Sequence, residues 1–265
     1  MLGISPFFTV YILVLAFLFG AVFASFLGCV AWRISKGESF LKGRSHCDVC
    51  NHPLGAKDLV PIASYLARKG RCAYCKAPIP KSSLIGEIFL AVLFVLAVLR
   101  FDISPKLVLA LVFICILYVV SLTDMYEQII PDGCLLIAIV VRVVYYFVVE
   151  HFEWNTFLAL LGNGLSISLP LLLLTLLMEK ILKKEAMGGG DIKLVFVTGL
   201  YLGWQNNLLM MFFACVIGII IGFIQAQKDT DEDENYFPFG PSIAIGAVIT
   251  LFVGDALIGW YLSLF

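Results

Sequence analysis

The stretch LVLALVFICILYVVSLTD, residues 107–124, decides what kind of fold this chain can form. It is an almost entirely apolar run that ends in the carboxylate of Asp124. A run of this kind is typical of a helix that crosses the hydrocarbon core of a membrane, which is about 30 Å thick. A carboxylate beside such a helix is costly to keep there and usually has a task. Asp124 is therefore the first candidate functional residue.

The composition of the whole chain fits the same class of protein. Of its 265 residues, 61% are hydrophobic and 14% are charged, whereas about 25% are charged in an average soluble domain. So much apolar surface cannot be buried in a soluble core of this size. The sequence predicts an all-α polytopic integral membrane protein in a lipid bilayer, with about eight transmembrane helices and a small loop domain.

Eight apolar runs are long enough, or nearly so, to cross a bilayer. The first is predicted to be a retained span, because no basic segment precedes it and no cleavage site follows it. The sixth is short and contains Gly199 and Gly203, so it could be tilted or re-entrant. No internal repeat is evident. The runs are 7–31, 84–100, 105–122, 130–149, 156–178, 192–204, 207–226 and 241–264.

The charges of the loops predict which side of the membrane faces the cytoplasm. Residues 33–83 carry ten Lys or Arg against three acids. Because this segment lies between two spans, orientation explains its charge better than a nucleic-acid partner does. The positive-inside rule therefore puts both termini outside, and Asp124 and Asp191 on the cytoplasmic face. The loops on that face are 32–83, 123–129, 179–191 and 227–240.

Asp191 is a second carboxylate at a membrane boundary, in the context Met187-Gly-Gly-Gly-Asp191. Glycine allows backbone angles closed to other residues and the close approach of a second chain. The three glycines could therefore hold an extended substrate strand and deliver Asp191 beside it. The simpler interpretation is that Asp191 caps the sixth run and Asp124 ends the third run in solvent. No strand precedes the glycines and no Lys-Ser/Thr follows them, so a nucleotide loop is disfavoured.

Four of the eight cysteines form two Cys-x-x-Cys pairs, Cys47 with Cys50 and Cys72 with Cys75. On a cytoplasmic loop this pattern predicts a tetrahedral zinc site closed by four thiolates. A closed site leaves no open position for a substrate, so the zinc would be structural and would stabilise a loop too small for a large core. A redox dithiol pair is the alternative, but a reducing cytosol and the lack of a βαβ context count against it.

Two charges interrupt or end the fourth run, at Arg142 and Glu150. Their separation of eight positions puts them roughly on one helix face but too far apart to pair directly. Arg142 is expected to face the bundle interior or a wet cleft near a carboxylate, or else to snorkel to the interface.

Five motifs follow one another along the chain. They are Gly20…Ser25-Phe26…Arg33, the double Cys-x-x-Cys loop, Asp124…Ile130-Pro131-Asp132, Glu185…Gly188-Gly189-Gly190-Asp191…Lys193, and Pro238-Phe239-Gly240-Pro241. In this order they resemble the motifs of the type IV prepilin peptidases, membrane aspartyl proteases of the Gly-x-Gly-Asp class. The resemblance implies that Asp124 and Asp191 are the catalytic pair of an aspartic endopeptidase. It also implies supporting roles for Asp132, Glu185, Lys193 and the three glycines.

The same resemblance implies cleavage of prepilin or pseudopilin leaders at the cytoplasmic face of a bacterial inner membrane. Such a substrate has a short basic leader, a glycine before the cut and an apolar helix that stays in the membrane. Many members also methylate the new N-terminus with S-adenosylmethionine, an activity associated with the zinc loop, and we assign no donor site. The implied parts are a first transmembrane helix (1–32), a cytoplasmic zinc-binding loop (33–83) and a membrane peptidase domain (84–265).

Two other classes of protein stay open at this point. A transporter would be expected to place its carboxylates near the membrane midplane, whereas Asp124 and Asp191 lie at an interface. A zinc-stapled scaffold subunit of a secretion or pilus assembly would need no carboxylate pair. A cleavage assay with a prepilin separates the three classes.

Overall fold

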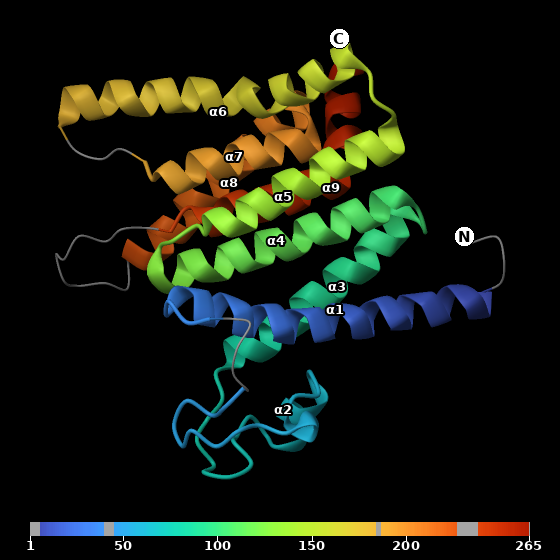
Figure 1. Ribbon diagram of the computed structural model, residues 1–265, viewed down its shortest axis with the longest axis vertical. Coiled ribbons are helices and arrows are strands. Elements are labelled where there is room, and N and C mark those ends of the chain that lie inside the picture. The colour runs from blue at the N-terminus through green and yellow to red at the C-terminus, as the bar shows by residue number, and fades with distance from the viewer. Residues whose placement is uncertain (1–5, 40–44, 184–186, 227–237, 265) are drawn as a thin grey trace. The chain divides into compact units, whose positions relative to one another are not determined.

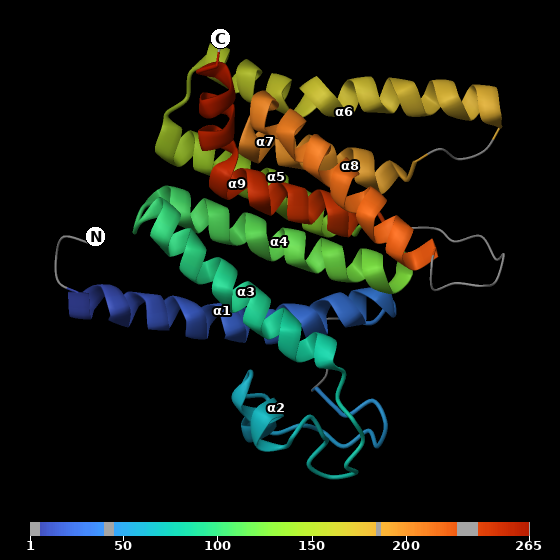
Figure 2. The ribbon, with the colours of Figure 1, turned by 180° about the vertical axis from the view of Figure 1, so that it is seen from behind.

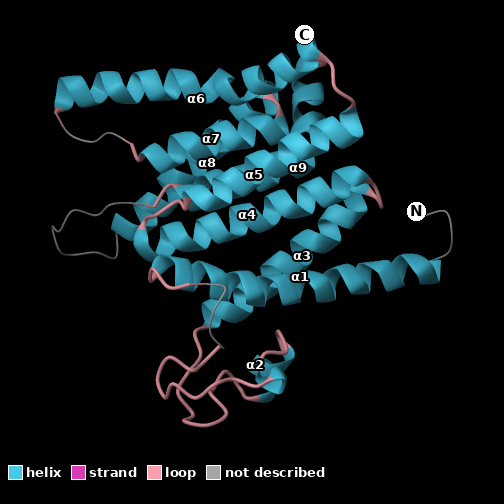
Figure 3. Ribbon diagram, in the orientation of Figure 1, coloured by secondary structure: helices cyan, strands magenta, loops and turns pink. Residues whose placement is uncertain are grey.

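The computed structural model describes residues 6–39, 45–183, 187–226 and 238–264 (Figure 1). Within these ranges the regular secondary structure consists of helices, apart from two isolated β-bridges (Figure 3). The all-α fold class is therefore confirmed. The short elements are η1 (Ala56–Asp58), α2 (Ala63–Ala67) and the π-helical turn η2 (Tyr146–Glu150). The long helices are α1 (Pro6–Ser35), α3 (Lys81–Phe101), α4 (Pro105–Glu127), α5 (Asp132–Tyr145), α6 (Trp154–Leu182), α7 (Gly189–Leu202), α8 (Trp204–Ala226) and α9 (Gly240–Leu262).

Seven of the described helical segments are long and apolar enough to cross a membrane. They comprise α1, α3, α4, α5 continued through η2, α6, α8 and α9. The multi-pass prediction is therefore confirmed. The exception is α7, which corresponds to the short sixth run and has 14 residues. At 1.5 Å per residue it is about 21 Å long, short of the ~30 Å hydrocarbon core.

The outward faces of the long helices are apolar, as a lipid solvent requires. On α6, Leu173, Leu174, Leu176 and Leu177 are each more than half exposed. In water such a continuous apolar stripe would be an interaction or aggregation site. In a bilayer these side chains face lipid, and the helix needs little contact with its neighbours along this stretch.

The chain forms two compact units, Met1–Val119 and Val120–Phe265. In the first unit α1 packs against α3 through small residues. A Cβ on Gly20 would lie 2.7 Å from the Cα of Ala91, and Ala24 and Ala97 are buried. Small residues let membrane helices approach closely. This contact explains the glycine of the first motif.

In the second unit α7 is the central helix, with α5, α6, α8 and α9 against it (Figure 2). Two buried polar side chains fix α7 to α8. The hydroxyl of Thr198 donates to Oδ1 of Asn207 at 2.8 Å, and Nδ2 of Asn207 donates to the carbonyl of Val195 at 3.2 Å. A satisfied network in a low-dielectric interior sets one helix register, and this register also positions the first turn of α7.

One end of the second unit gathers the last turn of α4 and the first turns of α5, α7 and α9 (Figure 1). Two bonds between distant segments hold it together. The amide of Gly240 donates to Asp124 at 2.8 Å, and Lys193 pairs with Asp132 at 2.8 Å. We call this region the carboxylate end.

Arg142 is buried, and the expectation that it faces the interior near a carboxylate is confirmed. Its Nε donates to the carbonyl of Leu200 at 2.9 Å, and its Nη2 lies 3.3 Å from Oε2 of Glu150. The expectation that Arg142 and Glu150 lie too far apart to pair was wrong. Eight residues rise about 12 Å along an α-helix, but the chain changes to a π-helical turn after Tyr145, and two long side chains close the remaining gap.

Candidate active site and metal site

Asp124 lies in the last turn of α4 and is only 5% exposed. The simpler interpretation, in which it ends the helix in solvent, is therefore wrong. Its Oδ2 accepts the amide hydrogen of Gly240, the first residue of α9. A Cβ at position 240 would lie 2.7 Å from that oxygen, so only glycine fits without displacing the carboxylate. No pattern in the sequence indicates that residue 240 contacts residue 124.

Asp191 is the third residue of α7, and the helix is capped by Gly188 without any side-chain hydrogen bond. Asp191 is therefore not the N-cap residue that the simpler interpretation required. The positive end of the helix dipole favours a carboxylate in this first turn. Its Oδ1 is buried and has no hydrogen-bond partner among the described residues. A buried acceptor of this kind is expected where a substrate or a water is bound.

The two carboxylates influence each other. Asp191 lies outside the seven membrane-spanning helices, and burial, followed by the negative charge of Asp124, raises its pKa to about 7. Two carboxylates in a poorly solvated site cannot both ionise cheaply. Asp191 can therefore hold a proton near neutral pH. The pair can thus hold one proton between two acids.

Two of the three glycines before Asp191 allow close packing rather than unusual backbone angles, and a Cβ on Gly189 would meet no atom within 4 Å. A Cβ on Gly190 would lie 3.0 Å from Cβ of Ile130, and one on Gly188 would lie 3.3 Å from Oδ2 of Asp191. None of the three has a positive φ. The chain that approaches Gly190 is the protein's own α4–α5 connection, and the predicted approach of a substrate strand stays a prediction.

Two of the predicted supporting residues meet each other. Nζ of Lys193 donates to Oδ1 of Asp132 at 2.8 Å, and the side chains are 57% and 75% exposed. An ion pair this exposed contributes little to stability. Its position is more informative, because it joins the first turn of α5 to the turn of α7 that carries Asp191. Glu185, the remaining predicted supporting residue, lies outside the described residues.

The four cysteine sulfurs, of Cys47, Cys50, Cys72 and Cys75, all lie within 4.8 Å of one another and could hold a metal ion. Sγ of Cys47 and Sγ of Cys75 are 3.8 Å apart. A tetrahedral zinc with bonds of about 2.3 Å places its sulfurs about 3.8 Å apart. The donor set and its spacing therefore fit zinc.

The thiols of this cluster do not ionise alike. The amides of Cys75 and Tyr74 lower the pKa of Cys72 to about 6. The amide of Ala77 lowers the pKa of Cys75, but local desolvation and the neighbouring thiols outweigh it and raise the value to about 11. Four thiolates so close together need a cation to offset their mutual repulsion.

The two cysteine pairs are a structural repeat with an offset of 25 residues, which corrects the expectation that the chain has none. Both halves read Cys-x-x-Cys-x-x-Pro, at 47–53 and 72–78, and this pattern could have been recognised. The backbone hydrogen bonds of the two halves match. The amide of Cys47 donates to the carbonyl of His52 at 3.0 Å, as that of Cys72 does to Ala77 at 2.8 Å. The amide of Leu54 donates to the carbonyl of Ser45, as that of Ile79 does to Gly70, both at 2.8 Å.

The segment between the two halves is tied down by polar contacts within the first unit. The carboxylate of Asp58 accepts the amide hydrogen of Gly55 at 2.7 Å and forms an ion pair with Arg68. The amide of Ile62 donates to Oε2 of Glu87 on α3 at 2.7 Å. We call residues 45–79 the cysteine loop.

Seven apolar helices among the described residues, with a buried and a partly buried carboxylate at one end of the second unit, define a multi-pass membrane protein with a pair of coupled acids. Residues 111–223 match the type IV leader peptidase family, and residues 18–101 match the bacterial peptidase A24 N-terminal domain. The chain belongs to the type IV leader peptidase family.

Several relatives align with most of the chain. The prepilin leader peptidase/N-methyltransferase of Bacillus subtilis (strain 168) is 31% identical over 248 residues, which cover 94% of this chain and 97% of that protein. The proteins of the same name from Legionella pneumophila and Pseudomonas putida are 30% and 28% identical, covering 83% and 93% of this chain and 76% and 92% of their own. No solved structure matches the chain.

Proposed function

We propose that the chain cleaves the leader peptide of type IV prepilins or pseudopilins, with Asp124 and Asp191 as its catalytic pair. The observation that carries the proposal is the coupling between the two carboxylates, in which burial and then the charge of Asp124 raise the pKa of Asp191 to about 7. The relatives support it, because their printed name is prepilin leader peptidase/N-methyltransferase.

The reaction is hydrolysis of a peptide bond by a water held between the two carboxylates. The ionised carboxylate takes a proton from the water as the water oxygen attacks the scissile carbonyl carbon. The protonated carboxyl donates its proton to the carbonyl oxygen, which gives a tetrahedral diol. The C–N bond then breaks as one carboxyl protonates the leaving amine and the other accepts a diol proton. The pair ends as it began, with one shared proton.

Neither aspartate is assigned as the acid or the base, because the titration of a coupled pair belongs to both groups. Their positions rest on different elements. The Gly240 amide holds Oδ2 of Asp124, and the first turn of α7 presents Asp191. Carboxylates fixed before the substrate arrives need no reorganisation during the reaction.

The cysteine loop would hold one structural zinc through Cys47, Cys50, Cys72 and Cys75, which matches the spacing of their sulfurs. The names of the relatives support a second activity, N-methylation of the new N-terminus. S-Adenosylmethionine would supply the methyl group. We assign no residues to its binding and derive no step through it.

The orientation and domain division remain part of this proposal. The ten Lys or Arg of residues 33–83 favour the cytoplasm for this loop and for the carboxylate end of an inner-membrane protein. The first transmembrane helix would be 1–32, the zinc loop 33–83 and the peptidase domain 84–265. A basic leader that stays in the cytoplasm would meet the site on this face.

The competing classes are not favoured. A transporter would place its carboxylates near the midplane, whereas Asp124 and Asp191 lie in the terminal turns of their helices. A scaffold subunit gives no reason to bury and couple two carboxylates.

The test is a cleavage assay with purified protein in detergent and a prepilin, read as a shortened product with a new N-terminus. Asp124→Asn and Asp191→Asn each keep the shape of the side chain and should slow cleavage by at least about 10²-fold. The matched control is Asp102→Asn. Asp102 is an exposed residue with φ 55° whose side chain accepts the Ile103 amide hydrogen, and asparagine tolerates that conformation. Full processing by either active-site variant would overturn the assignment.

A further inference from the structure

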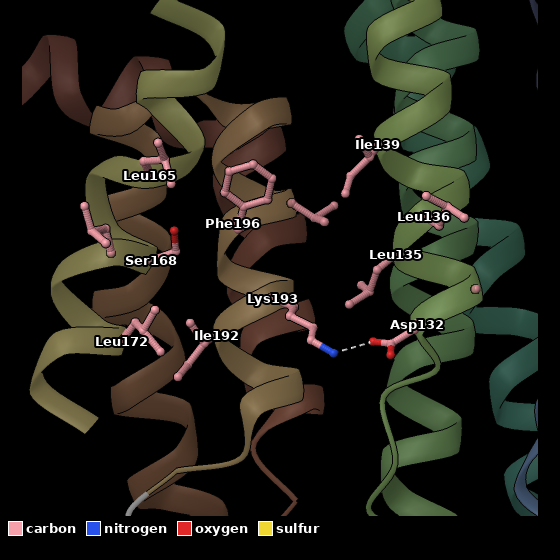
Figure 4. A pocket seen from close by; sticks show the side chains of 13 residues that line it. Asp132, Leu135, Leu136, Ile139, Leu165, Ser168, Leu172, Ile192, Lys193 and Phe196 are labelled. Atoms are coloured by element: carbon pink, nitrogen blue, oxygen red, sulfur yellow. Dashed lines mark hydrogen bonds and ion pairs between the residues drawn. The ribbon is translucent and has the colours of Figure 1, made fainter. Parts of the chain in front are cut away.

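A groove of about 510 Å³ lies on one face of the second unit, lined by α5, α6 and α7 (Figure 4). Its lining is apolar along most of its length. Leu136 of α5 and Leu165, Leu169 and Leu172 of α6 are between 38% and 62% exposed. The groove is therefore open at the side of the unit, where the surrounding solvent is the bilayer.

One end of the groove coincides with the carboxylate end. Ile192 and Lys193, which directly follow Asp191, belong to its lining, and Lys193 reaches across to Asp132 of α5 (Figure 4). This ion pair is the charged part of the lining. The groove thus starts at the first turns of α5 and α7 with two charges and continues along α7 as an apolar surface. Asp191 is in the same first turn of α7 but is not part of the lining.

The length of the groove matches a short piece of helix. Its lining runs from Leu165 to Leu172 on α6 and from Ile192 to Val197 on α7. Eight residues rise about 12 Å, or roughly two helical turns. The α6 positions are spaced i, i+3, i+4, i+7, which presents one straight stripe.

We propose that this groove binds the first turns of the substrate's apolar helix, immediately after the scissile bond. The inference rests on the proposed function. If the scissile bond is cut at Asp124 and Asp191, the helix that follows it is tethered within the first turn of α7, which also supplies Ile192 and Lys193 to the groove. This tether raises its effective concentration there above that of a free lipid chain.

The lining suits a helix because small residues allow close backbone approach. No atom lies within 4 Å of a Cβ built on Gly133. The hydroxyl of Ser168 donates to the Gly164 carbonyl at 2.8 Å, so it needs no hydrogen-bond acceptor from an apolar partner. Small residues of this kind are typical of the contacts between membrane helices.

The charges at the mouth are complementary to the substrate at both stages of the reaction. The Asp132 side chain is 75% exposed and can pair with a second cation beside Lys193. Before cleavage that cation is the basic leader, and after cleavage it is the new ammonium at the start of the product helix. Asp132 would therefore mark where the helix begins.

The first test fills the groove and compares two substrates. Gly133→Phe places a ring in the groove, and Gly162→Phe is the matched control, since Gly162 is also a helical glycine with nothing within 4 Å of its Cβ and lies outside the lining. For a full-length prepilin, Gly133→Phe should raise KM about tenfold, with kcat unchanged. A peptide that spans the cut but lacks the apolar helix should be cleaved as by wild type. Gly162→Phe should change neither.

The outcomes separate the groove from the proposed function. Equal losses on both substrates, or no loss on the full-length substrate, would overturn the groove. If wild-type protein cleaves neither substrate, the proposed function itself fails.

The second test identifies the occupant directly. A photoreactive benzoylphenylalanine at Leu169, in the Asp124→Asn background, should crosslink to the apolar helix of a full-length prepilin in lipid vesicles. The same group at Leu173, which is 59% exposed but outside the lining, should label lipid. Labelling of lipid alone from Leu169 would show that the groove is an acyl-chain site and would overturn the inference.

Discussion

The cysteine loop and the carboxylate end are built by opposite means. Each half of the loop closes its own backbone hydrogen bonds within ten residues and presents two thiols. The carboxylate end takes one acid from residue 124 and the other from residue 191, and fixes the first with an amide from residue 240. The loop site is therefore a local structure that a metal would stabilise, whereas the carboxylate site depends on the packing of a whole helical bundle. Damage to one should leave the other intact.

The largest expected effect is loss of the metal from the loop. Cys47→Ser should reduce the zinc content from one per chain to none, because a structural zinc contributes on the order of 10 kcal/mol or more to folding. Residues 45–79 should then become sensitive to protease, while the helices keep their circular dichroism. Elemental analysis and limited proteolysis measure both. Cys215→Ser, which alters a cysteine outside the cluster, is the control. An intact protein without zinc would contradict the metal site.

The corresponding substitution at the carboxylate end is Gly240→Ala. The new Cβ would meet Oδ2 of Asp124 at 2.7 Å and must displace the carboxylate. Moving a catalytic group by about 1 Å can cost about 10²-fold in rate. The kcat for prepilin cleavage should therefore fall by that factor, while the zinc content stays at one per chain. Gly259→Ala lies on the same helix with nothing within 4 Å and should keep wild-type activity. Equal activity of the two variants would remove Gly240 from the site.

The pH dependence should distinguish the two regions further. Because the pKa of Asp191 is raised to about 7, its carboxyl holds a proton below that pH and loses it above. Cleavage should therefore decline on the alkaline side of about pH 7, approaching tenfold per pH unit as the shared proton is lost. Thiolate ligands behave in the opposite sense and release metal when acid protonates them. A cleavage rate that stays flat from pH 7 to 9 would contradict the shared proton.

The smallest expected effect concerns the Arg142–Glu150 pair, at the opposite end of the fourth apolar run from Asp132. Glu150→Gln removes the charge that faces Arg142 at 3.3 Å, and Glu150 is 39% exposed there. A partly exposed pair is worth about 1 kcal/mol at most, which lowers the melting temperature by about 2–4 °C in a chain of this size. Thermal unfolding in detergent measures it, with Glu153→Gln as the control. Zinc content and cleavage should not change.

The sequence predicted what depends on local pattern. Apolar runs located the long helices, and the spacing of the cysteines located the cluster that the folded chain assembles. Loop charges also put Asp124 and Asp191 on one side, and both lie at one end of the second unit. Each of these inferences needs only residues close in sequence, or the alternation of spans across a bilayer.

What could not be predicted depends on packing over long distances or on irregular geometry. The amide of Gly240 reaches an acid 116 residues away, and no periodicity reports such a contact. The pairing of Arg142 with Glu150 depends on a π-helical turn, which has no sequence signature here. The groove between α5, α6 and α7 is assembled from three helices, so no single stretch contains it.

The 25-residue offset within the cysteine loop has an evolutionary consequence. Each half is a hairpin of about ten residues with its own backbone hydrogen bonds, and the span from Gly55 to Lys69 carries no thiol of the cluster. A duplicated hairpin followed by divergence would produce this arrangement. The intervening span is then free to lengthen, shorten or acquire new residues without altering the metal's coordination. Diversification within the loop should therefore concentrate between the two hairpins, where a new binding surface can evolve on a fixed zinc-bound base.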